Sequence, residues 1–220
     1  MTKPLPTLLV IRHGETQWNL AGRLQGRRDS PLTLNGVRQT LAVAVRLSET
    51  ISKQFWNAAF WVSPLGRARQ TASILADSWS LPFNLFGEAP DVLERNYGVW
   101  EGLTQQEIRD TYPDQFASHG ADPWGFLVPQ GESRTMLTSR VASWLQQLDP
   151  AVPHVVVTHS GCLRALRGIY EKALPDEILQ YREAQTSSFL LSSESCTALD
   201  VPSSVLKVLG CSGAGGTVWI

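Results

Sequence analysis

Short apolar runs alternate along this chain with segments in which apolar residues recur every three or four positions. The runs lie near residues 7–11, 59–63, 154–159 and 187–192, and each is short enough to form one buried strand. The segments between them have the apolar spacing of amphipathic helices. Strands that alternate with helices predict an α/β fold, in which a mostly parallel central sheet lies between two helical layers as a three-layer α/β/α sandwich.

The expected helices are identified by their apolar stripes and their caps. Thr33 is a suitable N-cap for a helix whose stripe would face the core, and Thr104–Glu107 has the pattern of a capping box. The stripe after Thr33 consists of Leu34, Val37, Leu41 and Val45, and the other stripes of Ala68, Ala72, Leu75 and Ala76, of Met136, Leu137, Val141, Trp144, Leu145 and Leu148, and of Leu163, Leu166, Ile169 and Tyr170.

The stretch from Tyr112 to Gly131 breaks this regular pattern. It mixes prolines and glycines with aromatic residues, which indicates a long irregular segment. Such a segment in a compact domain is often a lid or a binding loop, and a packed surface excursion is the equal alternative. We therefore expect a single domain over residues 1–220, with a lid or insertion at about 104–131.

Composition narrows the classes of partner. The formal net charge is −1, so the chain lacks the basic surplus of a nucleic-acid-binding protein. The first apolar run stops at Arg12, which argues against a secretory signal and a membrane span. The three cysteines lack metal-ligand spacing and fit a reducing compartment, so we expect a cytoplasmic protein without a metal site. The tail Gly215–Ile220 has no functional interpretation.

Two of the predicted strands lead directly into a histidine. One is followed by Arg12 and His13, and the strand near 154–159 ends at His159. Because the carboxyl ends of parallel strands meet at one edge of a sheet, we expect these side chains to form one site. Two imidazoles and a guanidinium suit an oxyanion such as a phosphoryl group.

Two further segments add groups that fit phosphate chemistry. Ser63 can cap a helix with Pro64 at its first position, which would place Arg67 in the first turn, where a phosphate meets both the guanidinium and the helix amides. Glu94 lies beside apolar and aromatic residues, which favours a carboxyl group that acts as a proton donor. Each segment alone also fits an ordinary solvated surface.

Taken together, the runs Arg12–Asn19, Ser63–Ala72 and Tyr97–Gly102 resemble the histidine phosphatase superfamily, in the branch that holds the phosphoglycerate mutases. The resemblance extends from Leu8 to about Phe189. It implies a phosphoglycerate mutase-like fold, a nucleophilic His13 that becomes phosphorylated, and Glu94 as general acid and then base. It also implies that Arg12, Arg67 and His159 clamp the phosphoryl oxygens. The residues expected to bind the phosphate or the substrate are Asn19, Gln25, Gly26, Tyr97, Ser160 and Gly161.

Members of this superfamily include hydrolases and isomerases, so the fold does not decide the reaction. Mutases use a lysine where this chain has Gln105, and Arg109 is the only basic residue between Glu101 and Glu132. We therefore expect a phosphomonoester hydrolase that needs no metal or cofactor and acts on a small-molecule phosphate monoester. The mutase-like residues Arg95 and Tyr97 keep a cofactor-dependent phosphoglycerate mutase as the alternative.

A third alternative is a non-catalytic module that binds phosphate or a phosphoprotein. The complete set of proposed catalytic residues argues against it. The physiological substrate stays open, and so does the oligomeric state, with a homodimer as one alternative. Neither nucleic acid nor a membrane is an expected partner.

Overall fold

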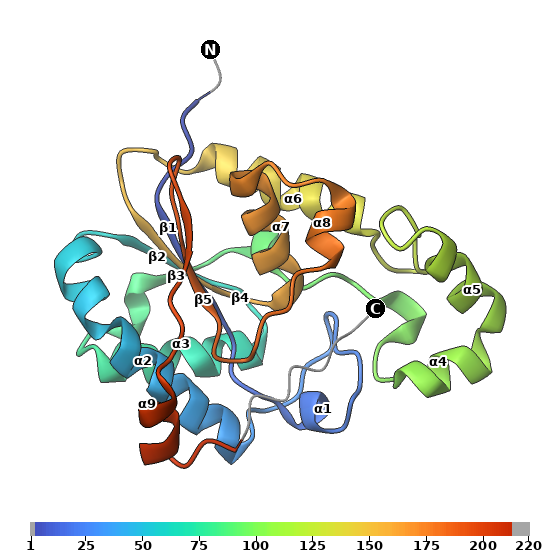
Figure 1. Ribbon diagram of the computed structural model, residues 1–220, viewed down its shortest axis with the longest axis horizontal. Coiled ribbons are helices and arrows are strands. Elements are labelled where there is room, and N and C mark those ends of the chain that lie inside the picture. The colour runs from blue at the N-terminus through green and yellow to red at the C-terminus, as the bar shows by residue number, and fades with distance from the viewer. Residues whose placement is uncertain (1–2, 213–220) are drawn as a thin grey trace.

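A six-stranded sheet forms the centre of the computed structural model, which describes residues 3–212 (Figure 1). The strand order is β3-β2-β4-β1-β5-β6; the first four strands of this order are parallel, β5 is antiparallel to β1, and β6 is antiparallel to β5. The strands are β1 Leu8–Arg12, β2 Ala59–Val62, β3 Phe86–Glu88, β4 His154–Thr158, β5 Ser188–Leu191 and β6 Cys196–Ala198. The tail Gly215–Ile220 lies outside the described residues.

Helices cover both faces of the sheet, so the predicted three-layer α/β/α sandwich is confirmed (Figure 1). Helices α2, α3 and α9 lie on one face, and α6 and α7 cover the other, where α8 packs against α7. The helices are α1 Gln17–Leu20, α2 Leu34–Gln54, α3 Gly66–Ser78, α4 Gln105–Thr111, α5 Pro113–Ala121, α6 Arg134–Gln147, α7 Ser160–Glu171, α8 Pro175–Leu179 and α9 Ser203–Val208. Short 3₁₀ turns lie at Phe83–Leu85, Pro90–Val92 and Gly98–Trp100.

The two central strands explain why the apolar runs were readable in the sequence. Every residue of β1 and of β4 is buried, because both faces of these strands are covered by helices. In register, Arg12 lies opposite Thr158, so the residues that follow the two strands leave the sheet side by side. All four strands expected from the sequence are present, whereas β3 and β6, of three residues each, were not predicted because they lack an apolar run.

Helix α2 begins after Thr33 as predicted, and the Thr33 hydroxyl accepts a hydrogen bond from the Gly36 amide. The predicted core-facing stripe is wrong: Leu34 and Val45 are exposed. The helix instead buries Thr40, Val43, Ala44, Leu47 and Ile51, together with Gly36 and Gln39. This face contains small and polar residues because the helix packs closely against α3 and against the loop that follows β1.

The irregular segment expected from Tyr112 to Gly131 is partly wrong, because α5 occupies its first half. The predicted capping box at Thr104 is present and opens α4. These two helices and the loop after them lie to one side of the sandwich (Figure 1) and enclose their own small core, formed by Leu24, Trp100, Ile108 and Val128. We call residues 104–131 the insert.

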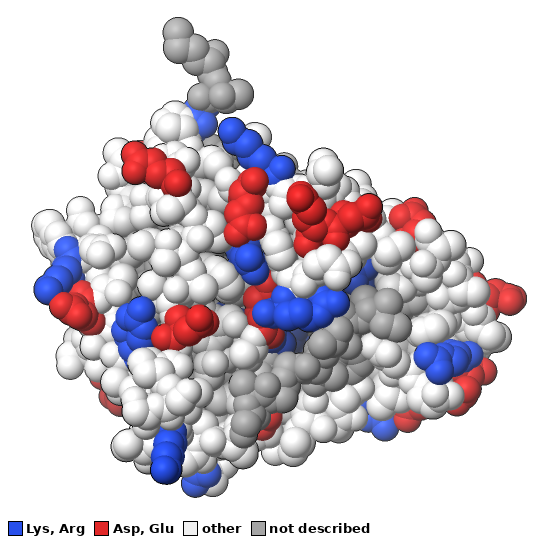
Figure 2. Space-filling view, in the orientation of Figure 1, with Lys and Arg blue, Asp and Glu red and all other residues white. Residues whose placement is uncertain are grey.

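Charge is distributed over the surface without a dominant sign. On the face seen in Figure 2, lysines and arginines alternate with aspartates and glutamates. Within residues 3–212, no helix is both long enough and apolar enough to span a lipid bilayer.

Candidate active site

A cavity of about 860 Å³, open to solvent, lies at the carboxyl ends of β1 and β4. The cavity is lined by all but one of the residues predicted for the site, namely Arg12, His13, Asn19, Gln25, Gly26, Arg67, Glu94, Tyr97, Ser160 and Gly161. His159 is the exception.

His13 follows β1, and the backbone of the next residue holds its ring in one orientation. Its Nδ1 lies 2.7 Å from the carbonyl oxygen of Gly14. A carbonyl only accepts hydrogen bonds, so Nδ1 carries the proton and the neutral ring keeps its lone pair on Nε2. Burial, followed by the positive charges of Arg67 and Arg12, lowers the pKa of His13 well below its ordinary value. The imidazole is therefore neutral and has an available nucleophilic nitrogen at neutral pH.

Two arginines lie beside this imidazole on separate elements. Arg12 ends β1, and its Nη1 donates to the carbonyl of Glu183 at 2.6 Å. Arg67 lies in the first turn of α3, and its Nη2 donates to the Gly26 carbonyl at 2.7 Å. Each Nε is buried and, among the described residues, meets no hydrogen-bond partner. A buried N–H without a partner is costly, so both guanidiniums are suited to bind an anion.

The start of α3 differs from the prediction. Ser63 does not cap the helix, which begins at Gly66 after the N-cap residue Leu65. The Asp29 carboxylate occupies the helix N-terminus, where it accepts from the Arg67 amide at 3.4 Å and from Arg67 Nη1 at 3.0 Å. The Arg67 guanidinium is therefore the part of this turn that is available to a ligand.

His159 lies behind His13 rather than on the cavity surface. The two ring centroids are 5.2 Å apart, and His159 is fully buried. Its Nε2 is 2.7 Å from the hydroxyl of Ser63, whereas its Nδ1 meets no partner within residues 3–212. Burial and the charge of Arg67 lower its pKa well below the ordinary value, so the ring is neutral in the unliganded protein.

Glu94 is fixed between the loop after the Pro90–Val92 turn and the start of α7. One carboxylate oxygen accepts from the amide of Arg95 at 2.7 Å, and the other accepts from the amide of Gly161 at 3.2 Å. A Cβ at position 161 would lie 2.2 Å from Glu94 Oε1, so only glycine lets the carboxyl approach the helix this closely. The side chain is buried at the cavity wall.

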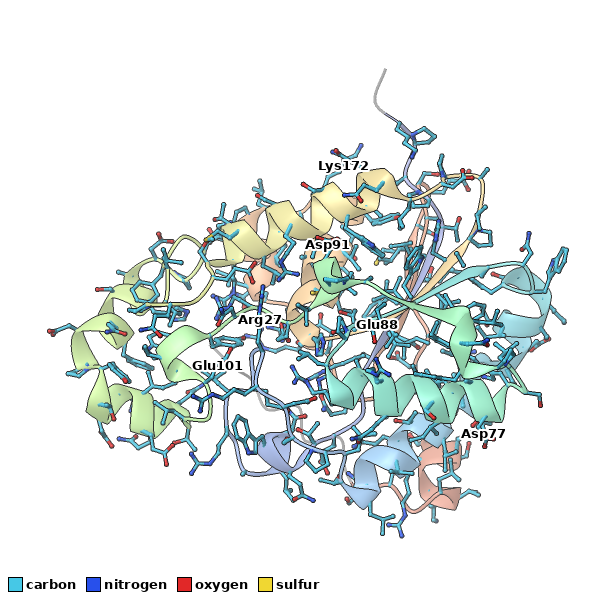
Figure 3. The ribbon with its side chains drawn as sticks, turned by 180° about the vertical axis from the view of Figure 1, so that it is seen from behind. Arg27, Asp77, Glu88, Asp91, Glu101 and Lys172 are labelled. Atoms are coloured by element: carbon cyan, nitrogen blue, oxygen red, sulfur yellow. The ribbon has the colours of Figure 1, made fainter. Side chains whose placement is uncertain are left out.

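Glu101 is a positioning residue that sequence reasoning did not assign. Its carboxylate accepts from the amides of Arg27 and Arg28, at 2.8 and 3.1 Å, and from the Tyr97 amide at 3.1 Å. Arg27 and Glu101 are labelled in Figure 3, where they lie between the insert and the sandwich. Gly26 has a φ of 55°, and a Cβ there would lie 2.0 Å from the Glu101 carboxylate. The loop that contains Gly26 and the segment that contains Glu101 can therefore meet only with glycine at position 26.

Three further predicted residues, Asn19, Gln25 and Ser160, are held by contacts outside the catalytic groups. Gln185 donates to the side chain of Asn19 at 2.9 Å, and Asn19 also accepts from the Thr16 amide at 3.1 Å as part of a capping box. Gln25 accepts a hydrogen bond from the Ser30 hydroxyl at 3.2 Å. Ser160 is the first residue of α7, whose N-terminus favours negative charge.

The cavity carries more positive charge than Arg12 and Arg67 supply, and sequence reasoning found only part of it: Arg95 had been noted as mutase-like, whereas Arg134 and Arg164 had not been assigned. Arg23, Arg95, Arg134 and Arg164 also line it, in addition to Arg12 and Arg67. The stretch between Glu101 and Glu132 does contain Arg109 as its only arginine or lysine, but the cavity receives its other arginines from outside that stretch. The tertiary fold brings Arg134 from the start of α6 and Arg164 from α7, and the sequence positions of these two residues gave no indication of it.

No cluster of three or more histidine, cysteine, aspartate or glutamate side chains that could hold a metal ion is present in residues 3–212. Cys162, near His159, is buried and donates to the Leu93 carbonyl at 2.9 Å. Burial raises the pKa of its thiol to about 12, so it is an inert core residue.

The sequence of residues 8–198 matches the model of the histidine phosphatase superfamily (branch 1). The chain belongs to this superfamily. Members similar to it include both phosphatases and mutases. A metal-independent phosphoserine phosphatase of Arabidopsis thaliana is 35% identical over 165 residues, which cover 72% of this chain and 66% of that enzyme. The chain thus spans slightly less than two thirds of this relative.

A 2,3-bisphosphoglycerate-dependent phosphoglycerate mutase of Bartonella henselae is 31% identical over 180 residues, which cover 79% of this chain and 85% of that enzyme. Among solved structures of the superfamily fold, Bacillus stearothermophilus YhfR has a TM-score of 0.74 at 27% sequence identity, over 88% of this chain and 95% of that one. The superfamily and its fold are thereby established, whereas the reaction of this chain is a separate question.

Proposed function

We propose that the protein is a metal-independent phosphomonoester hydrolase that works through a phosphohistidine at His13. The observation that supports this most is the 2.7 Å contact between His13 Nδ1 and the Gly14 carbonyl. It leaves the lone pair on Nε2 in a cavity wall that also contains Arg12 and Arg67. Neutral imidazole is a competent nucleophile, and the arginines supply the charge stabilisation that phosphoryl transfer requires.

In the first half-reaction, His13 Nε2 forms a bond to phosphorus while the ester P–O bond breaks. The protonated carboxyl of Glu94 gives its proton to the leaving oxygen. Arg12 and Arg67 bind the equatorial oxygens through guanidinium N–H groups. His159 lies behind His13, where its Nε2 is 2.7 Å from the Ser63 hydroxyl and its ring packs against the His13 ring at 5.2 Å between centroids, so it supports the nucleophile from within the core.

In the second half-reaction, the Glu94 carboxylate takes a proton from a water molecule. The water oxygen forms a bond to phosphorus as the P–N bond breaks, which returns neutral His13 and protonated Glu94 and releases inorganic phosphate. Asn19, Gln25, Gly26, Tyr97, Ser160 and Gly161 complete the walls around the phosphate and the substrate.

The mutase alternative is favoured by one observation, the additional arginines in the cavity wall. A mutase must hold an intermediate with two phosphates and return the phosphoryl group before water attacks. Incubation with 3-phosphoglycerate and catalytic 2,3-bisphosphoglycerate separates the two reactions. Free phosphate without 2-phosphoglycerate supports the hydrolase, and rapid 2-phosphoglycerate formation with negligible phosphate release contradicts it.

The covalent intermediate is tested by mixing the enzyme with a ³²P-labelled monoester and stopping the reaction in alkali, which preserves phosphohistidine. Label on the wild-type chain and none on the His13→Ala variant is the expected result. Activity that persists in EDTA, together with inhibition by vanadate, is expected for a site without metal. Loss of activity in EDTA that a divalent ion restores would instead indicate metal-assisted hydrolysis.

A further inference from the structure

The backbone that carries Glu94 has no regular structure to hold it in place. We call residues 91–97 the acid loop; within it, residues 93–97 belong to no helix or strand. The polar groups of such backbone lack repeating partners of their own, so they must be satisfied by other elements. The position of the Glu94 carboxyl therefore depends on the groups that bind this loop.

Arg140 of α6 binds the acid loop before Glu94. Its Nη1 donates to the carbonyls of Asp91, at 2.6 Å, and of Leu93, at 3.1 Å. Asp91, labelled in Figure 3, belongs to the short turn against which α6 packs. The other two nitrogens, Nε and Nη2, each donate to Glu132 at 2.9 Å. All three nitrogens of this guanidinium are engaged, in a planar arrangement that a lysine cannot reproduce.

Glu132 binds the acid loop after Glu94. Its carboxylate accepts from the Asn96 amide at 3.2 Å, and its own amide donates to the Asn96 carbonyl at 2.8 Å. Thr158 and Cys162 also bind this loop, but they do so at carbonyls that precede Glu94. The pair of Arg140 and Glu132 thus holds the backbone on both sides of the proposed acid.

This ion pair lies in the interior, next to the cavity but not in its wall. The side chains of Arg140 and Glu132 are 17% and 9% exposed, and neither is among the described residues that line the cavity. Burial alone would lower the pKa of Arg140 and raise that of Glu132, but their mutual hydrogen bonds reverse both shifts, so the pair is ionised. Because desolvation offsets most of the attraction in a buried pair, stability does not by itself account for it.

We propose that Arg140 and Glu132 are positioning residues that hold the acid loop so that the Glu94 carboxyl meets the leaving oxygen of the substrate. The inference rests on the proposed function, because it takes Glu94 as the proton donor. The amides of Arg95 and Gly161 hold the tip of this side chain, and the ion pair holds the backbone from which it extends. Proton transfer needs hydrogen-bond contact, so a small displacement of this backbone slows it.

The dependence of the rate on the leaving group measures this role. We compare kcat/KM for p-nitrophenyl phosphate, phenyl phosphate and alkyl phosphates, whose leaving groups need increasing help from a proton. Arg140→Met should lower kcat/KM by about 30-fold on alkyl esters and by less than about threefold on p-nitrophenyl phosphate. Arg140→Lys should show a smaller loss with the same dependence, because it keeps the charge but binds fewer groups at once.

Arg167→Met is the matched control. Arg167 also forms a buried ion pair, with Glu183 at 2.9 Å, and its side chain is 16% exposed. Both of its carboxylate partners, Glu171 and Glu183, lie outside the acid loop. Any loss in this variant should therefore be the same factor on every ester. A loss that depends on the leaving group in Arg167→Met as strongly as in Arg140→Met would overturn the specific role of Arg140.

Two double variants exclude a purely structural effect. Arg140→Met leaves Glu132 buried without its partner, whereas Arg140→Met with Glu132→Leu removes both charges and protects the fold. This double variant should show the same dependence on the leaving group. Arg140→Met should add no further dependence in a Glu94→Gln background, because no acid then remains to be positioned. An unchanged dependence in the folded Arg140→Met and Glu132→Leu double variant would overturn the proposal.

Amide hydrogen exchange separates failure of the positioning role from failure of the hydrolase. It requires no turnover, and the amides of Arg95 and Asn96 report on the loop directly. Arg140→Met should accelerate their exchange about tenfold or more, and Arg167→Met should not. Unchanged exchange in folded Arg140→Met overturns the positioning role even if the wild type hydrolyses every ester. Faster exchange supports it even if the wild type hydrolyses none, a result that would overturn only the hydrolase.

Discussion

The two sides of the cavity differ in how their side chains are held. On the sheet side, formed by Arg12, His13, Arg67 and Glu94, Arg12 ends the buried strand β1, His13 follows it, and both side chains are held by backbone carbonyls. On the insert side, Arg95 and Arg134 extend from a loop and from a helix start, and they contact aromatic rings. A rigid sheet edge suits a reaction centre that must not change, whereas loops and a helix end can vary in sequence and thus change the specificity.

The largest expected effect is at the centre of the sheet side. His13→Ala should reduce kcat by roughly 1,000-fold or more on every monoester, because no other group can form the covalent intermediate. Phosphate release measures the loss, and circular dichroism controls for folding. Retention of more than about a tenth of wild-type kcat would remove His13 from the nucleophile role.

A smaller loss of activity is expected when Arg67, which we propose to bind the phosphoryl oxygens, is replaced by lysine. Arg67→Lys should lower kcat/KM by about 100-fold on all substrates, because lysine keeps the charge but cannot present the planar fork. The loss should be the same for singly and doubly anionic esters. A loss confined to doubly anionic esters would assign Arg67 to leaving-group recognition and erase the distinction between the sides.

A third prediction isolates proton transfer. Glu94→Gln should slow esters with poor alkoxide leaving groups by about 100-fold or more, and p-nitrophenyl phosphate much less, because p-nitrophenolate leaves without a proton. Both substrates share the same clamp, so general damage would lower both rates equally. Equal losses of rate on the two kinds of ester would leave the proposed hydrolase intact but would show that Glu94 is not the general acid.

The smallest expected effect is on stability and concerns the insert side. The folded pKa of His119 is about 4, below its ordinary value of 6.5, so the unfolded chain takes up the proton first. The free energy of unfolding should therefore fall as the pH drops from about 6.5 towards 4, with His119 contributing on the order of 1 kcal/mol after allowance for solvent screening.

Urea denaturation at pH 7.5 and at pH 5 measures this contribution. His119→Gln should lower the free energy of unfolding less at pH 5 than at pH 7.5. At pH 5 the unfolded wild-type chain is stabilised by protonation of His119, which has already reduced the stability of the wild-type protein. An identical pH dependence in wild type and His119→Gln would contradict the assignment.

The sequence predicted those parts of the molecule that depend on local patterns. The runs in β1 and β4 are readable because burial on both faces makes them wholly apolar, and Arg12 and His13 follow directly. The stripe of α2 was misassigned because its buried face includes glycine and threonine, which carry no hydrophobic signal. Strand β3, of three residues with a central glycine, is too short to leave a pattern.

Within the site, local sequence patterns predicted which residues follow neighbouring strands, but they did not predict contacts that depend on how distant elements pack. The register of β1 with β4 places His13 beside His159, and parallel strands that end in histidines suggested that outcome. The burial of His159 behind His13 depends on the Ser63 hydroxyl, which local patterns assigned to a helix cap instead. The position of Arg134 depends on how α6 docks, and no local pattern encodes that.

The contact between Arg12 and Glu183 has a consequence for the order in which the protein becomes active during synthesis. The two residues are 171 positions apart, and the carbonyl that orients Arg12 lies in the last fifth of the chain. A ribosome-bound chain that already contains His13, Arg67, Glu94 and His159 therefore still lacks the acceptor for its first arginine. The site is thus completed only after residues 183–187 have emerged from the ribosome and docked beside β1.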